Sequence, residues 1–189
     1  MSGGEGKVFV VSSPSGGGKT TVIKSLLRKM RTLRRSISVT TRSPRPGERN
    51  GRDYSFVAPA RFLALRKSDS LIEWAKVHGA YYGTPRQPIL KSVRTGRDVV
   101  LSIDVQGARK IRRVLGKRAV LIFLLPPSMA VLKQRLLARS TETPEALQQR
   151  LLAAKRELGC AADYDYKIVN DHVQHAVAQL VAIIKKRGR

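Results

Sequence analysis

The chain has 189 residues, a length that suits a single α/β domain with a buried core. Its 37 lysines and arginines outnumber 13 acidic residues, and the formal net charge is +24 at pH 7. No stretch is long and apolar enough to predict a membrane-spanning helix, and the opening residues lack the apolar run of a signal peptide. The single cysteine excludes an intrachain disulfide and a cysteine-built metal site, so we expect a cytoplasmic location.

The N-terminal part predicts a phosphate-binding loop. Residues 8–21 read as an apolar strand, a glycine-rich turn and the start of a helix. Consecutive glycines let backbone N–H groups surround a phosphate chain, and the helix adds its positive N-terminal end. Lys19 then reaches the terminal phosphates of a nucleoside triphosphate, and the Thr20 hydroxyl is placed to coordinate Mg²⁺. Ser13 stands where the pattern has its first glycine, and the alternative is an ordinary glycine-rich turn.

Beyond the loop, the apolar pattern predicts a parallel sheet with helices on both faces. Short, nearly continuous apolar runs are typical of strands buried on both sides, whereas apolar residues at helical spacing predict amphipathic helices. We expect further core strands at residues 98–103, 119–125 and 166–169. We expect helices directly after the loop, at residues 105–115, 128–138 and 144–160, and from about residue 173 onwards. The fold class is α/β, with a core like that of phosphate-loop NTPases.

Residues 35–96 interrupt this alternation of strands and helices. They are richer in Ser, Thr, Tyr, Pro and Gly, and residues 44–47 and 50–51 have turn sequences. Short β pieces at residues 36–41 and 53–57 fit better there than long helices. A polar insertion beside a phosphate loop is a natural pocket for a second substrate. We therefore expect a core made of residues 1–34 and 97–189, and a small mixed β-rich subdomain made of residues 35–96.

The insertion and the chain after it contain a series of motifs: SISVTTRSPRPGE at 36–48, GRDYSF at 51–56, IEWAKVHG at 72–79, YYGT at 81–84, IDVQG at 103–107, LPPS at 125–128, RSTET at 139–143 and IVND at 168–171. Together they resemble guanylate kinase, the family that transfers a phosphoryl group from ATP to GMP. The resemblance runs from about Val8 to the C-terminus and keeps the order and spacing of the motifs. It implies Mg²⁺-dependent phosphoryl transfer, a GMP-binding subdomain and a mobile helical lid at about residues 138–150.

The resemblance implies that Arg42, Arg45, Tyr54 and Tyr82 hold the GMP phosphate. A guanidinium group donates two parallel hydrogen bonds to phosphate oxygens, and phenol hydroxyls donate the remaining bonds. The alternative for the two arginines is surface charge in a very basic chain.

Guanine presents N1–H and N2–H₂ donors beside the O6 acceptor, so a carboxylate and hydroxyls suit it. Positions that match the family give Glu73 as the carboxylate and Ser38 and Thr84 as the hydroxyls. Adenine offers the opposite pattern, so we expect Glu73 to discriminate against AMP. The alternative for Glu73 is a solvated acid at a helix end. Asp104, at the C-terminal end of its strand, is expected to contact the substrate side or the hydrated metal.

The phosphate of GMP has a second pKa of about 6, so phosphoryl transfer to it needs no general base. Catalysis is expected from in-line positioning and from cations around the migrating group, with Lys19, Arg42, Arg139 and Arg150 as the catalytic residues. The resemblance makes Asn170 an adenine contact; a cap for the last helix is an equal alternative. The expected ATP-binding residues are Ser13, Pro14, Ser15, Gly16, Gly17, Gly18, Lys19, Thr20, Thr21, Arg135 and Asn170.

Two positions depart from the family pattern. Ser102 stands two residues before Asp104, where relatives usually have an acid, so we expect the contact to metal or nucleotide to rest on Asp104 alone. Ser140 replaces the glycine of the family's lid sequence, which is expected to stiffen the lid or alter its closure.

Three other functions stay open. The first is a guanylate-kinase-like interaction module without catalysis, although the loop glycines, Lys19 and the lid arginines are retained. The second is a different phosphate acceptor, such as a sugar phosphate. The third is nucleic-acid binding, because residues 6–47 and 105–141 contain no acidic residue and such fields attract polyanions. We favour a basic surface that steers anionic nucleotides. The expected partners are ATP with GMP or dGMP and at most non-specific nucleic acid, with no membrane, for a monomer or homodimer.

Overall fold

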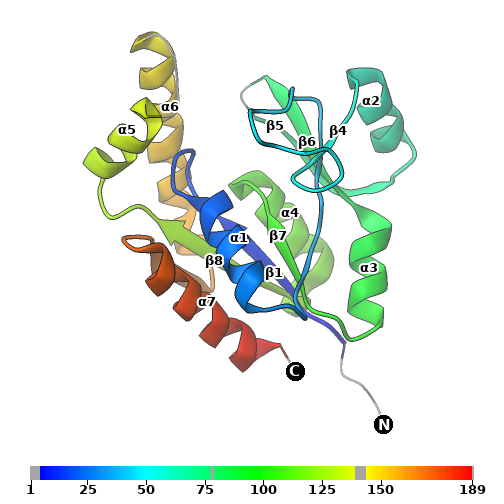
Figure 1. Cartoon of the computed structure of the whole chain (residues 1–189). Helices are drawn as coiled ribbons and strands as arrows, with labels where there is room; N and C mark the ends of the chain where they lie inside the picture. The colour runs from blue at the N-terminus through cyan, green and yellow to red at the C-terminus, as the bar shows by residue number, and fades with distance from the viewer. Residues whose placement is uncertain (1–4, 78, 139–143, 189) are drawn as a thin grey trace.

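The computed structural model describes residues 5–77, 79–138 and 144–188. Its core is a five-stranded sheet in the order β2-β7-β1-β8-β9, in which every neighbouring pair is parallel (Figure 1). The strands are β1 (Val8–Ser12), β2 (Arg34–Arg35), β7 (Val99–Ser102), β8 (Ala119–Leu125) and β9 (Tyr166–Val169). The predicted parallel sheet is confirmed, with β7 shorter than residues 98–103. The edge strand β2 has no apolar run, because both of its residues are arginines.

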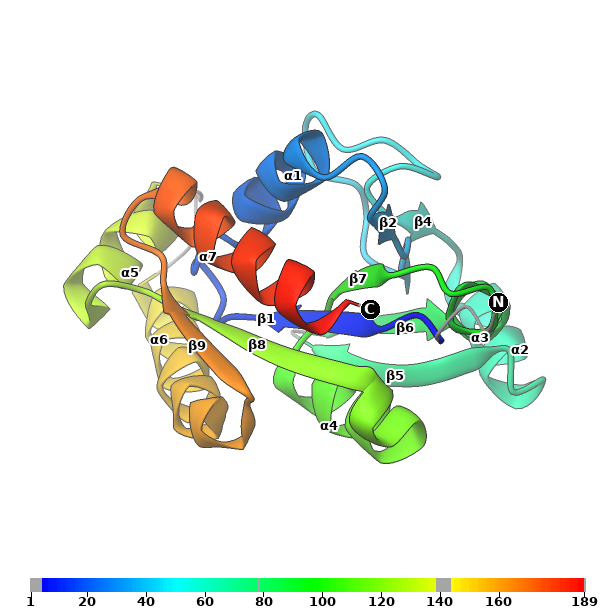
Figure 2. The same ribbon diagram turned by 90° about the horizontal axis from the view of Figure 1, so that it is seen from below.

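Helices cover both faces of this sheet, as Figure 2 shows for α1 and α7 on one side and α4 on the other. Successive side chains of a strand point to opposite faces, so Val8 packs with α3 and α4 while Phe9 packs with α1 and α7. Burial on both faces explains the nearly continuous apolar character of the core strands. The four helices are α1 (Lys19–Lys29), α3 (Arg86–Arg94), α4 (Val105–Leu115) and α7 (Val173–Arg187).

A second, four-stranded sheet is formed within residues 35–96, in the order β4-β3-β6-β5. Its elements are β3 (Val39–Thr40), β4 (Ser55–Phe56), β5 (Leu71–Val77), β6 (Ala80–Pro85) and the covering helix α2 (Pro59–Lys67). The expected short β pieces lie at β3 and β4. The helices α2 and α3 were not expected in this stretch. Helix α2 has a weak pattern of apolar residues at helical spacing, because Phe62 is its one buried side chain. Its first residue is Pro59, a position at which proline is well tolerated.

The helices α5 (Met129–Leu137) and α6 (Pro144–Gly159) lie on the opposite side of the core from the second sheet (Figure 1). They pack against each other through Leu132, Leu136 and Ala154, a small cluster separate from the main core. Short 3₁₀ turns at Gly116–Arg118 and Cys160–Asp163 complete the described elements. In the part of the chain that is described, no helix is long and apolar enough to cross a membrane.

Candidate active site

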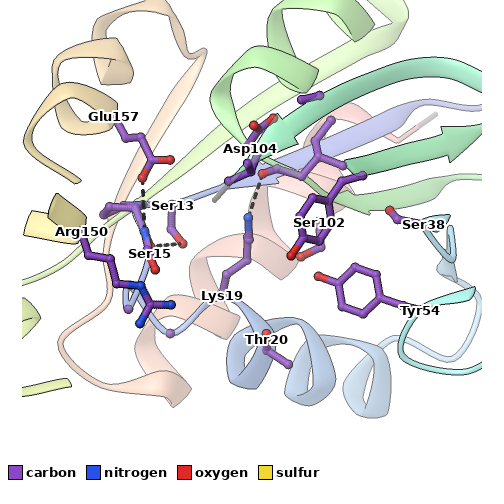
Figure 3. A pocket seen from close by; sticks show the side chains of 18 of the residues that line it. Ser13, Ser15, Lys19, Thr20, Ser38, Tyr54, Ser102, Asp104, Arg150 and Glu157 are labelled. Atoms are coloured by element: carbon purple, nitrogen blue, oxygen red, sulfur yellow. Dashed lines mark hydrogen bonds between the residues drawn. The ribbon is translucent and has the colours of Figure 1, made fainter. Parts of the chain in front are cut away.

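One cavity lies where the phosphate loop, the end of β7, the second sheet and α6 meet (Figure 3). Ligands bind at the carboxyl ends of the strands in open parallel sheets. Most of the predicted site residues line it: Ser13, Pro14, Ser15, Gly16, Gly17, Gly18, Lys19, Thr20, Ser38, Arg45, Tyr54, Glu73, Tyr82, Asp104 and Arg150. The remaining lining residues are Ala75, Val77, Ser102, Ile103 and Glu157. The expected ATP and GMP sides therefore open onto the same space.

The phosphate loop joins β1 to α1 and requires glycine at two positions. Gly16 and Gly18 have φ angles of 85° and 86°, in the left-handed region that other residues enter only with strain. Gly18 is also the N-cap of α1. Since Gly18, Lys19 and Thr20 line the cavity, the first turn of α1 lies at the place where a phosphate chain is best stabilised.

The Lys19 ammonium group is held at the end of β7. Its Nζ donates a hydrogen bond of 2.8 Å to the carbonyl oxygen of Ile103. Burial lowers the pKa of Lys19, and the carboxylates of Asp104 and Glu157 oppose this shift. Asp104 itself is fixed as the N-cap of α4, because its side chain accepts a hydrogen bond of 2.8 Å from the backbone N–H of Gly107. The cavity thus pairs a positioned cation with two acids.

Glu157, on α6, is a cavity residue that the sequence did not predict. Its Oε2 accepts a hydrogen bond of 3.2 Å from the backbone N–H of Ser15 in the phosphate loop. Burial raises the pKa of Glu157, whereas the Ser15 bond and Lys19 lower it. Arg150 lies about two helical turns earlier on the same helix, so both face the cavity. That spacing was the one indication available in the sequence.

Glu73 is a buried acid on β5, with 4% of its surface exposed. Thr84, its partner on β6, donates a hydrogen bond of 2.5 Å to Glu73 Oε1. Burial raises the pKa of Glu73 to about 7; Thr84 and Lys110 oppose this shift, and Asp104 adds to it. The alternative of a solvated acid at a helix end is wrong, because this carboxyl group is buried in a sheet. Thr84 is fully buried and is not among the cavity-lining residues, but it is hydrogen-bonded to Glu73, which is.

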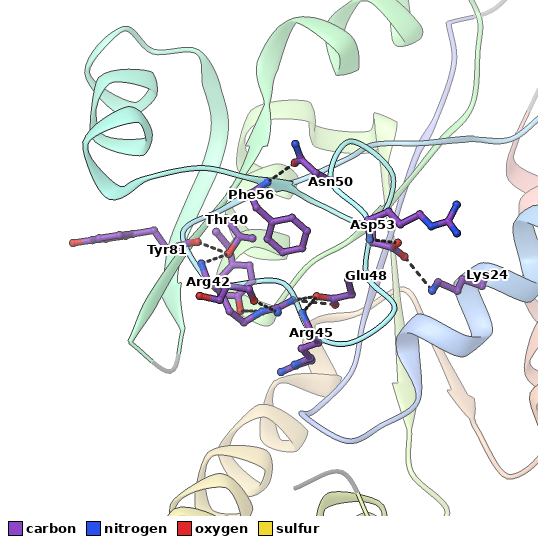
Figure 4. Close-up of polar contacts among 12 residues, drawn as sticks. Lys24, Thr40, Arg42, Arg45, Glu48, Asn50, Asp53, Phe56 and Tyr81 are labelled. Carbon is purple, nitrogen blue, oxygen red and sulfur yellow. Dashed lines mark hydrogen bonds and ion pairs between the residues drawn. The ribbon is translucent and has the colours of Figure 1, made fainter. Parts of the chain in front are cut away.

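Arg42 contacts two of the predicted phosphate-binding residues, Tyr82 and Tyr54. Figure 4 shows Arg42 beside Arg45, a third predicted residue, and Glu48. Arg42 Nε donates a hydrogen bond of 3.2 Å to Tyr82 Oη, and its Cζ lies 5.4 Å from the centre of the Tyr54 ring. Arg42 Nη2 also forms an ion pair of 2.9 Å with Glu48 Oε2, the oxygen that accepts a hydrogen bond from the backbone N–H of Arg45. Glu48 was not predicted as a site residue. The only sign of its role in the sequence was that Glu48 is the first acid after a long acid-free stretch and follows Arg42 by six positions.

Asn170 contacts the phosphate loop, and Arg135 contacts Asn170. Asn170 Nδ2 donates a hydrogen bond of 2.8 Å to the carbonyl oxygen of Gly17, and Arg135 Nη2 donates one of 3.1 Å to the carbonyl oxygen of Asn170. The alternative of Asn170 as a helix cap is wrong, because the N-cap of α7 is His172 and no side chain caps that helix. Thr21 is exposed and is not among the cavity-lining residues.

Two of the sequence predictions concern residues outside the described ranges, namely Arg139 and the lid substitution Ser140. Arg150 is described and lines the cavity from α6. Ser102 also lines the cavity, at the end of β7 and two residues before Asp104.

Known proteins resemble this chain over almost its whole length. The family model for guanylate kinase matches residues 5–187. A guanylate kinase from Cutibacterium acnes is 50% identical over 94% of this chain and 89% of the relative, and one from Dechloromonas aromatica is 44% identical over 97% and 90%. The crystal structure of guanylate kinase from Anaplasma phagocytophilum superposes with a TM-score of 0.82 at 35% identity, covering 96% of this chain and 86% of that one. With a phosphate loop and a buried Glu73 at one cavity, the chain belongs to the guanylate kinase family.

Proposed function

We propose that this member of the guanylate kinase family transfers the γ-phosphoryl group of ATP to GMP, and to dGMP, across the cavity between its two sheets. The observation that carries the proposal is that Lys19, from the phosphate loop, and Glu73, from the second sheet, line the same cavity. ATP bound on the loop and GMP bound beside Glu73 meet end to end. A non-catalytic interaction module is not favoured, because the loop glycines, Lys19 and Arg150 are all present at the cavity.

Recognition of GMP divides between its base and its phosphate. The Glu73 carboxylate accepts from the guanine N1–H and N2–H₂ groups, while the hydroxyls of Ser38 and Thr84 serve the O6 side of the base. Arg42, Arg45, Tyr54 and Tyr82 form the phosphate clamp. In support, Ser38, Arg45, Tyr54 and Tyr82 line the cavity, and Arg42 contacts the Tyr82 hydroxyl. On this proposal the GMP phosphate competes with Glu48 for Arg42.

The chemical step relies on positioning and on cations. The attacking oxygen of the GMP phosphate is already deprotonated near neutral pH, so no proton has to be removed in the reaction. Lys19 neutralises charge on the terminal phosphates, and Arg139 and Arg150 approach the migrating group from the lid. Asn170 and Arg135 support the loop. We propose that they and Thr21, on α1, contact the adenosine part of ATP. Exclusion of water by the closed lid prevents loss of ATP by hydrolysis.

Magnesium fits this site as a partner of ATP. Among the described residues, no group of three or more His, Cys, Asp and Glu side chains could hold a metal ion. Thr20 and Asp104 line the cavity and offer oxygen atoms, the ligands that Mg²⁺ prefers in combination with water and phosphate oxygens. We propose that Thr20 would hold the ion and that Asp104 would face the substrate side or the hydrated ion. When bound, the ion supplies further positive charge at the phosphates.

The proposed division of labour follows the chain. Residues 1–34 and 97–189 form the ATP-binding core, residues 35–96 the GMP-binding part, and residues 138–150 the lid. The second sheet supports the boundaries of residues 35–96. The helices α5 and α6 pack on each other in a cluster separate from the main core, which supports a lid between these two helices. The helix α3 also packs on the core sheet, which indicates that the GMP-binding part is anchored at its C-terminal end.

An acceptor panel tests the proposed function. Purified protein with ATP and magnesium is offered GMP, dGMP, AMP, CMP and UMP in a coupled assay for ADP formation. We expect GMP to be preferred over AMP by a factor of at least about a thousand, because adenine leaves a buried carboxylate unpaired. Equal turnover of GMP and AMP would contradict the role of Glu73, and no turnover of GMP would contradict the proposal as a whole.

The remaining expectations concern partners and location. We propose that the excess positive charge steers anionic nucleotides, that nucleic acid binds at most non-specifically, and that the protein is a cytoplasmic monomer or homodimer. Binding to RNA or DNA that survives physiological salt would contradict the steering role, because non-specific phosphate contacts weaken steeply as salt rises.

A further inference from the structure

Gly107 lies in the first turn of α4, directly beside the acid on β5. A Cβ atom at position 107 would lie 2.7 Å from Glu73 Oε2 and 3.1 Å from Glu73 Cδ. Both separations are shorter than the ordinary van der Waals distance between such atoms. A side chain at position 107 and the present position of the Glu73 carboxyl group therefore exclude each other.

The backbone does not require glycine here. Gly107 is an interior residue of the right-handed helix Val105–Leu115, a conformation in which alanine is favoured over glycine by about 1 kcal/mol. Its backbone N–H donates to the Asp104 side chain, a capping bond that any residue except proline could make. What glycine contributes at position 107 is therefore space, and Glu73 occupies that space.

The neighbouring contacts make it costly for the carboxyl group to move aside and prevent the helix from moving away instead. Thr84 holds Glu73 Oε1 from β6, so rotation of the side chain breaks that hydrogen bond. Lys110 Nζ donates to the carbonyl oxygen of Trp74, which ties α4 to β5 next to Glu73. Because helix and strand are joined at this point, a collision at position 107 displaces the carboxyl group.

We propose that Gly107 is a positioning residue for guanine selection, since its missing side chain lets the Glu73 carboxylate sit over the first turn of α4. The proposal rests on the role of Glu73 given above and extends it to a residue that does not touch the nucleotide. The Gly107→Ala variant keeps the helix and the acid but moves the acid away from the base-binding position.

A double-mutant cycle on stability tests the geometry without any reference to activity. Free energies of unfolding in urea are measured for the wild type, Gly107→Ala, Glu73→Ala and the double variant. Gly107→Ala is expected to destabilise the wild type and to be neutral or stabilising in the Glu73→Ala background, where the colliding group is absent. An equal loss of stability in both backgrounds, or failure of both Gly107→Ala proteins to fold, would overturn the proposal. The added methyl group would then collide with a neighbour other than Glu73, such as Asp104 Oδ1 at 3.2 Å.

Steady-state kinetics test the effect on selection. We expect Gly107→Ala to raise KM for GMP on the order of tenfold and to lower the preference for GMP over AMP, with KM for ATP almost unchanged. Gln106→Ala is the matched control, because Gln106 is the exposed neighbour on the same helix. A Gly107→Ala variant with unchanged selection would overturn this inference alone. A Glu73→Ala variant that keeps normal selection would overturn the guanine role of Glu73 and this inference with it.

Discussion

At the scale of single residues, Glu73 has different protonation preferences in the empty and the occupied site. Burial raises the pKa of Glu73 to about 7 in the unliganded protein, with opposing contributions from Thr84 and Lys110 and a further rise from Asp104. The two N–H donors of guanine favour the ionised carboxylate, because hydrogen bonds to the charged form lower a pKa. Binding of GMP should therefore release a proton near neutral pH.

This protonation difference predicts that KM for GMP rises as the pH falls from about 8 to about 6, since more of the free protein then carries a protonated Glu73. The phosphate of GMP also titrates near pH 6, so the comparison is made with Glu73→Gln. That variant should bind GMP more weakly but lose the Glu73 part of the pH dependence. Parallel pH profiles for the two proteins would contradict the prediction.

The contacts of Arg42 depend on the planar shape of its guanidinium group. Its guanidinium group contacts Tyr82, the carbonyl of Ser43 and Glu48 at once, which a lysine ammonium group cannot reproduce. We expect Arg42→Lys to raise KM for GMP by about tenfold or more while KM for ATP changes little. The matched control is Arg49→Lys, an exposed arginine in the same turn region, which should leave both constants unchanged. A similar response of the two variants would assign the effect to general surface charge.

At the scale of elements, α6 contacts the phosphate loop through Glu157. Glu157 brings a negative charge to the loop and also anchors it through the backbone N–H of Ser15. Glu157→Gln removes the charge and keeps an acceptor, so we expect KM for ATP to fall a few-fold as repulsion of the phosphates is relieved. Glu157→Ala removes the anchor too and should raise KM for ATP. Shifts in the same direction would contradict the two roles, and Lys155→Ala, on the exposed side of α6, is the control.

Arg139 lies between α5 and α6 in the sequence, outside the described residues. We expect Arg139→Ala to lower kcat on the order of a thousandfold while the affinity for ATP, measured by equilibrium binding, changes little. The reason is that a lid arginine stabilises the charge of the transition state and not the ground state. Equal losses in kcat and in ATP affinity would contradict the assignment of Arg139 to the lid.

At the scale of the whole molecule, an acid joins α1, the helix after the phosphate loop, to the segment 35–96 that forms the second sheet (Figure 4). Asp53 has 3% of its side chain exposed; its carboxylate forms an ion pair of 3.0 Å with Lys24 on α1 and accepts a hydrogen bond from the backbone N–H of Arg49. The hydrogen bond from Arg49 is the main cause of a lowered Asp53 pKa, with Lys24 contributing. The stabilisation is thus present above the ordinary pKa of an aspartate and is lost as the pH falls through the lowered value.

Asp53→Ala is expected to destabilise the protein by about 2 to 3 kcal/mol at neutral pH, because it leaves a backbone donor and a cation without their partner. The measurement is urea unfolding. Asp163→Ala is the control, since Asp163 also pairs with an arginine but its side chain is 49% exposed, and its loss should cost clearly less than that of Asp53. Equal losses for the two variants would contradict the structural role of Asp53.

The molecule also carries a formal charge of +24. The described ion pairs involve only a few of its lysine and arginine side chains. Charge of this size acts at long range and depends on salt, so it influences association with anions and not the choice of fold. Selection between nucleotides has to come from short contacts such as those of Glu73.

The sequence by itself determined the parallel core, the phosphate loop and the order of the motifs. These features depend on neighbouring residues: apolar runs specify buried strands, and Gly16 and Gly18 permit the backbone of the loop. Sequence reasoning failed for α2, α3 and β2, and the apolar pattern is weak in α2 and absent in β2. Only the tertiary structure decided that Glu73 bonds to Thr84, that Glu48 pairs with Arg42, that Glu157 reaches Ser15 and that Gly107 makes room for an acid. The physical reason is that burial and contact join residues from different elements, and no local periodicity encodes which of them meet.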